Sequence, residues 1–105
     1  MRILLDECLP VPMRDIFISH ECTAVSDRGW KGIKNGELLR LAEGQFDLFI
    51  TADQSIRYQQ NLGGRRIPIL ELSTNDLRRI LAAASVLQSA IETIKPTEFR
   101  QLEIP

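Results

Sequence analysis

The chain has 105 residues, which is enough for one domain spanning 1–105 with one modest core and too few for two. Apolar residues make up 44% of it and charged residues 26%, as in an ordinary water-soluble protein. The formal net charge of −1 gives no general attraction for nucleic acid, so a role there would need a local basic patch or a bridging metal ion.

Alternating apolar and turn-forming segments predict a series of strands and helices. The expected strands cover 1–5, 22–25, 47–51 and 67–70, and the segment 99–104 is expected to add an edge strand. The expected helices cover 11–19, 36–43 and 75–94, and the segment 53–62 is expected to be a short polar helix or irregular. Strands that alternate with helices at this spacing predict a parallel sheet with helices on both faces.

Particular residues predict where these elements end. Asn35 is expected to cap the second helix at its start and Gly44 to follow its end. Ser73, with Asp76 three residues later, has the pattern of a helix start before the long helix. Pro68 cannot donate a backbone hydrogen bond, so the fourth strand is expected towards an edge of the sheet.

Two of the apolar strands run directly into acidic residues. Asp6 and Glu7 follow the first strand and Asp53 follows the third, while Glu37 lies at the start of a helix. In an open α/β sheet, ligands bind at the carboxyl ends of the strands. Clustered carboxylates imply a compensating cation or proton, and Mg²⁺ and Mn²⁺ favour such oxygen ligands. Strand-end acids also serve simply as caps and turn residues, and that alternative stays open.

Three segments resemble motifs of PIN-like nucleases: LLDECLP at the first strand, KNGELLRLA after a glycine-containing loop, and LFITAD at the third strand. The likeness is closest to the small prokaryotic PIN-like branch associated with toxin–antitoxin systems, and it covers about residues 1–72. It implies a three-layer α/β/α sandwich with a mostly parallel sheet of four to five strands. It also implies that Asp6, Glu37 and Asp53 gather around Mg²⁺ or Mn²⁺, with Thr51 beside Asp53 and Glu7 in a supporting place.

The activity implied by this resemblance is that of a metal-dependent endoribonuclease, in which a metal-activated water hydrolyses RNA. The implied partners are RNA and a cognate antitoxin protein. The sequence departs from the family pattern in three places. Cys8 stands where an Asn is usual, and Asn35 or Gly36 stands where an acid commonly precedes the helix Glu. Gln54-Ser55-Ile56 stand where the family often has another Asp after the third strand. A catalytically impaired binding protein is therefore one alternative.

A receiver-type phospho-acceptor domain is a second alternative, since it also combines an acid pair after the first strand with an Asp after the third. Lys95-Pro96 resembles the Lys-Pro element of such domains. However, Lys95 follows a helix here rather than a strand, which counts against this interpretation.

Several residues outside the acidic group have the chemistry of RNA contacts. Trp30, flanked by Arg28 and Lys31, could stack on a base, and a Trp covering the core is an equal alternative. Phosphate contacts are expected from Arg57, Arg65 or Arg66, although each is individually typical of a solvated surface. The small residues at 82–85 would allow a homodimer contact.

Cysteine usage and apolar run length predict a cytoplasmic location. Cys8 and Cys22 have no CxxC spacing and are expected to be buried free thiols in a reducing compartment. No apolar run approaches the roughly 18–20 residues that span a bilayer, and the N-terminus lacks the pattern of a signal peptide. His20 is expected in a surface loop away from the acids.

Overall fold

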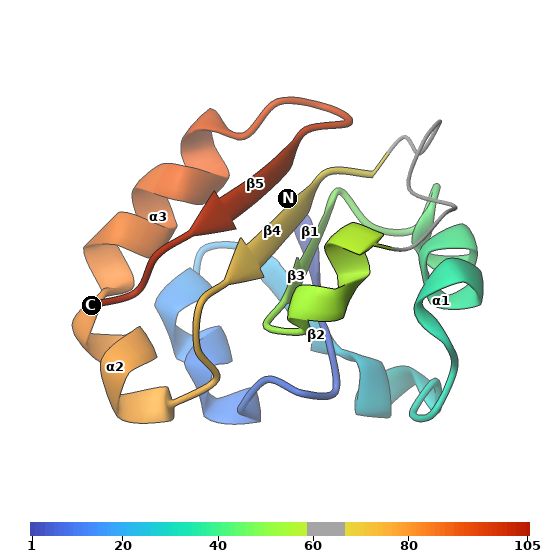
Figure 1. Cartoon of the computed structure of the whole chain (residues 1–105), viewed down its shortest axis with the longest axis horizontal. Helices are drawn as coiled ribbons and strands as arrows, with labels where there is room; N and C mark the ends of the chain where they lie inside the picture. The colour runs from blue at the N-terminus through green and yellow to red at the C-terminus, as the bar shows by residue number, and fades with distance from the viewer. Residues whose placement is uncertain (59–66) are drawn as a thin grey trace.

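A five-stranded parallel sheet forms the middle of the protein in a computed structural model that describes residues 1–58 and 67–105, with the backbone alone at Arg57 and Tyr58 (Figure 1). The strands lie in the order β2-β1-β3-β4-β5, and each neighbouring pair is parallel. Their bounds are β1 (Arg2–Leu5), β2 (Glu21–Ala24), β3 (Leu48–Thr51), β4 (Ile69–Leu72) and β5 (Phe99–Leu102). The expectation of a mostly parallel sheet of four to five strands is thus confirmed.

Helices cover both faces of this sheet, as a three-layer α/β/α sandwich requires. The α-helices are α1 (Asn35–Ala42), α2 (Leu77–Ala82) and α3 (Ala84–Thr93), and the 3₁₀ helices are η1 (Val11–Phe17), η2 (Val25–Arg28) and η3 (Gln54–Tyr58). Figure 1 shows α2 and α3 on one side of the sheet and α1 on the other. Among the described residues, no helix is long and apolar enough to cross a membrane.

Strand alternation divides the core into two apolar clusters, because successive side chains of a strand point to opposite faces. On one face Leu5, Ile50 and Leu70 pack with side chains of η1, α2 and α3. On the other face Leu4 and Phe49 pack with side chains of α1 and η3. The sheet is therefore buried on both sides, which explains why its strands read as continuous apolar runs.

The strand order places a topological switch point between β1 and β3. From β1 the chain crosses to β2 on one side, and from β2 it returns past β1 to β3. Connections leave this point in opposite directions, so a crevice is expected outside the carboxyl ends of β1 and β3. The acids predicted from the sequence follow these two strands.

The predicted helix over 75–94 is wrong at its middle, where the chain breaks into α2 and α3. Ala83 joins them with φ −100° and ψ 21°, outside the α-helical range, and is only 6% exposed. Both helices pack on η1, and Ala83 is buried in the same apolar cluster, so tertiary packing outweighs the local preference for a continuous helix. The local sequence, rich in alanine, favours an unbroken helix and gives no signal for the break.

The prediction for the fourth strand is also partly wrong. β4 begins at Ile69, and β5 pairs with it, so β5 rather than β4 lies at the edge. Pro68 is accommodated because it lies just outside the strand, where its carbonyl accepts a hydrogen bond from the Phe49 N–H at 3.0 Å.

The helix predicted over 11–19 is a shorter 3₁₀ helix in the structure, η1.

Candidate functional site

Asp6 and Thr51 meet at the carboxyl ends of β1 and β3. Leu5 pairs with Ile50, and the Asp6 N–H donates to the Ile50 carbonyl at 2.9 Å, so Asp6 lies beside Thr51. The Thr51 hydroxyl donates to Asp6 Oδ2 at 2.7 Å, and the Glu7 N–H donates to Asp6 Oδ1 at 2.8 Å. Asp6 is only 6% exposed and Thr51 is fully buried, so these bonds form away from bulk water.

The carboxyl group of Asp6 is held in an environment that disfavours its charge. Burial raises the pKa of Asp6 above its ordinary value, and the negative charge of Asp53 raises it further. The hydrogen bonds from Thr51, Glu7 and Cys8 oppose this rise in pKa but do not cancel it. A cation bound nearby would favour the ionised carboxylate.

Asp53 is the second carboxylate of the site, and both of its oxygens accept hydrogen bonds from Ser55 or Asn35. The Ser55 hydroxyl and N–H donate to Asp53 Oδ1 at 2.6 and 3.0 Å, and the Asn35 amide donates to Oδ2 at 3.2 Å. The Asp53 N–H donates to the Thr51 hydroxyl at 3.0 Å, so Thr51 connects the two acids. The hydrogen bond from the Ser55 hydroxyl is the main reason that the pKa of Asp53 lies below its ordinary value.

Glu37 does not join these two acids. It is exposed in the first turn of α1 and makes no hydrogen bond or ion pair with the part of the chain that the structure describes. Asn35, the first residue of α1, faces Asp53 instead. A helix turns about 100° per residue, so a side chain two positions later points to nearly the opposite side. Lys34, not Asn35, is the N-cap, and Asn35 uses its side chain on Asp53.

Glu7 faces the glycine-containing loop rather than Asp6 or Asp53. Its Oε1 accepts a hydrogen bond from the Gly32 N–H at 3.1 Å, and Gly32 has the positive φ of 87° that favours glycine. Across 1–58 and 67–105, no three His, Cys, Asp or Glu side chains form a group that could hold a metal ion. The structure thus brings together Asp6, Thr51 and Asp53 of the predicted residues.

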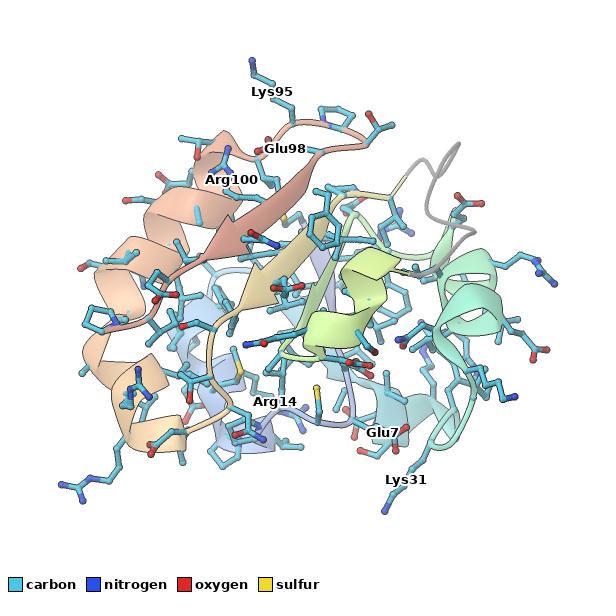
Figure 2. All side chains as sticks on the ribbon, viewed as in Figure 1. Glu7, Arg14, Lys31, Lys95, Glu98 and Arg100 are labelled. Atoms are coloured by element: carbon cyan, nitrogen blue, oxygen red, sulfur yellow. The ribbon has the colours of Figure 1, made fainter. Side chains whose placement is uncertain are left out.

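The residues predicted to contact RNA have different environments. Trp30 is half-buried, with its ring edge-to-face with Phe46 at 6.1 Å and Arg28 5.3 Å from its centre, so it contributes to packing. Lys31 is exposed, and Figure 2 shows it beside Glu7 at the carboxyl end of the sheet. The Arg57 side chain, Arg65 and Arg66 lie outside the described residues.

Three residues that hold the acids were not predicted as part of a site: Cys8, Asn35 and Ser55. The Cys8 thiol lies 3.7 Å from both Asp6 Oδ2 and the Thr51 hydroxyl. A signal for Ser55 exists in the sequence, since an Asp followed two residues later by a Ser is typical of a turn that the Asp side chain closes. His20 is at the other end of the sheet, where its Nδ1 is 2.9 Å from the Met1 amine, as expected for a residue away from the acids.

Although no third acidic, His or Cys side chain joins Asp6 and Asp53 among the described residues, the two carboxylates keep some capacity for a further ligand. A carboxylate has about four positions for accepting hydrogen bonds or binding a metal. Asp6 accepts from Glu7, Thr51 and Cys8, and Asp53 accepts from Ser55 twice and from Asn35, so each keeps about one position free. Mg²⁺ commonly binds through one or two carboxylates and completes its shell with water. The donor set therefore suits a single ion of this kind.

Comparison of the chain with protein-family models, with curated proteins and with solved structures gives no match.

Proposed function

We propose that the protein is a Mg²⁺- or Mn²⁺-dependent endoribonuclease of the PIN-like kind, with Asp6 and Asp53 as the carboxylates that hold the ion. One observation supports this most: the two acids follow adjacent strands at the switch point of a parallel sheet, and the Thr51 hydroxyl bonds both the Asp6 carboxylate and the Asp53 N–H. The resemblance of LLDECLP and LFITAD to PIN-like motifs is the reason for proposing RNA as the substrate. It also suggests a cytoplasmic toxin with a cognate antitoxin.

The chain's own residues orient the two carboxylates before any ion binds. Thr51 and the Glu7 N–H fix both oxygens of Asp6, while Ser55 and Asn35 fix those of Asp53. When bound, a divalent cation supplies Lewis-acid chemistry, which offsets charge on a phosphodiester and makes a water molecule more acidic. Lys31, exposed at the same end of the sheet, provides a positive charge for a neighbouring phosphate.

Asp53→Asn tests the proposal because it removes one charge and keeps the side-chain shape. We expect wild type to bind Mn²⁺ in calorimetry and to cleave single-stranded RNA, and Asp53→Asn to lose both by at least about tenfold. Asp15→Asn is the matched control, since Asp15 is an exposed acid on η1 and makes no hydrogen bond to Asp6, Thr51 or Asp53. If no Mn²⁺ binds to wild type at millimolar concentration, the acids are structural and the proposal is wrong.

A PIN-like protein that binds RNA but does not cleave it is the second candidate, and the position of Glu37 away from Asp6 and Asp53 favours it. In that case wild type would bind Mn²⁺ and RNA while leaving the RNA intact.

A phospho-acceptor role fits less well, because Lys95 precedes β5 and so lies at the amino end of the sheet, as Figure 2 shows. Asp53 is at the opposite end.

The toxin role is tested separately, by asking whether the adjacent reading frame encodes a protein that binds this one and suppresses its cleavage of RNA.

A further inference from the structure

The Cys8 thiol lies between the ends of β1 and β3 and contacts both. Its Sγ accepts a hydrogen bond from the Ala52 N–H at 3.4 Å, and it lies 3.7 Å from Asp6 Oδ2 and from the Thr51 hydroxyl. Cys8 is half-buried, so water competes only partly for these contacts. The other cysteine, Cys22 on β2, has no such position at the acid pair.

These contacts show from which group the Cys8 thiol accepts a hydrogen bond and to which group it donates one. The sulfur accepts from the Ala52 N–H, and the S–H group donates to Asp6 Oδ2, where the Thr51 hydroxyl also donates. Asp6 Oδ1 is held separately by the Glu7 N–H. The orientation of the Asp6 carboxylate therefore depends on three donors, and among them the Cys8 thiol is also held by the Ala52 N–H just after β3.

We infer that Cys8 is a positioning residue of this site, whose thiol fixes the orientation of the Asp6 carboxylate and so raises the affinity for the cation. The higher affinity for the cation rests on the proposed function, whereas the fixed orientation of the Asp6 carboxylate does not. Cys8 acts through Asp6 and not as a ligand, because hard cations such as Mg²⁺ and Mn²⁺ bind carboxylate and water oxygen in preference to sulfur. Removal of a partner that orients a metal ligand typically weakens metal binding by about 10–100-fold.

Two substitutions separate the thiol's hydrogen bonds from its volume. Cys8→Val keeps the approximate size of the side chain and removes both the donor and the acceptor, while Cys8→Ser keeps both. Cys22→Val is the matched control, since it makes the same change on β2. Amide hydrogen exchange of Glu7 in the metal-free protein reports the orientation of Asp6, because Asp6 Oδ1 holds that N–H. Calorimetry with Mn²⁺ reports the affinity.

We expect Cys8→Val to speed exchange at the Glu7 amide and to bind Mn²⁺ about tenfold more weakly. Cys8→Ser should keep most of the protection at the Glu7 amide and most of the Mn²⁺ affinity. Cys22→Val should behave as wild type. The inference is overturned if Glu7 exchanges equally fast in wild type and Cys8→Val, or if wild type binds Mn²⁺ and Cys8→Val binds it equally well. If wild type binds no Mn²⁺ while Cys8→Val still speeds Glu7 exchange, the proposed function fails and the positioning of Asp6 by Cys8 stands.

Discussion

Asp6 is buried at a position where its charge is unfavourable for folding. Burial raises its folded-state pKa above the ordinary value of 3.8, so the folded chain binds a proton more tightly there than the unfolded chain. The free energy of unfolding therefore falls as the pH rises from 3.8 through the folded-state pKa, and stays lower above it. Asp53 has the opposite sign, because its lowered pKa means that ionisation stabilises the folded state.

Asp6→Asn should therefore stabilise the metal-free protein at neutral pH. The amide keeps the Glu7 contact and can donate to Thr51, whose hydroxyl accepts as well as donates. We expect the free energy of unfolding to rise by about 1 kcal/mol, the scale of one buried polar interaction, and the gain to vanish at about pH 3 and below, where Asp6 is largely neutral in both states. Urea denaturation at both pH values measures it. A gain that persists at low pH would show that charge burial is not the cause.

The site could be predicted from the sequence only where a strand delivers a residue directly. Asp6 and Asp53 were found because a buried parallel strand fixes where its carboxyl end lies, whereas Thr51 was expected only from the resemblance to PIN-like motifs. Asn35 and Cys8 were missed because their contacts depend on the rotation of α1 and on the turn after β1, which periodicity does not fix. Glu37 shows the same limit, since its place in the first turn of a helix is predictable and the direction of its side chain is not.

At the scale of elements, the parallel sheet and its helical layers follow from the sequence, because apolar runs alternate with amphipathic segments. The break at Ala83 does not follow, since alanine favours a continuous helix and packing against η1 decides the outcome. The start of α2 was expected from Ser73 and Asp76 together. In the structure Asp76 is the cap, while the Ser73 hydroxyl accepts from the Ile104 N–H at 2.7 Å and ties the tail to the sheet.

Loss of this cap should weaken α2 measurably. The Asp76 carboxylate accepts from the backbone N–H groups of Arg78 and Arg79 at 2.9 and 3.3 Å, and α2 has only 6 residues over which to replace them. We expect Asp76→Ala to lower the free energy of unfolding by about 1 kcal/mol, while Asp76→Asn, which also caps well, keeps most of it. Chemical denaturation compares the two. Equal stability of Asp76→Ala and wild type would mean that the cap contributes nothing.

For the whole molecule, the strand order and the parallel pairing decide at which edge of the sheet the two acids gather. All five strands are parallel, so their carboxyl ends share one edge, and the acid pair lies at the switch point on that edge. Residues that the sequence places before strands, such as His20 and Lys95, lie at the other edge. Binding of a cation between β1 and β3 would join two strands whose pairing is central to the fold, so occupancy and global stability are coupled.

Mn²⁺ should therefore raise the melting temperature of wild type, because it binds the folded state and not the dispersed acids of the unfolded chain. At about 100 times its Kd the ion adds about 2.7 kcal/mol to the free energy of unfolding, which for a domain of this size is on the order of 10 °C. Asp6→Asn should show little shift, so the order of stabilities reverses: the variant is more stable without Mn²⁺ and wild type is more stable with it. Thermal unfolding of both proteins with and without Mn²⁺ measures this reversal. An equal shift in Asp6→Asn would mean that the ion binds elsewhere and that the acid pair has no part in holding it.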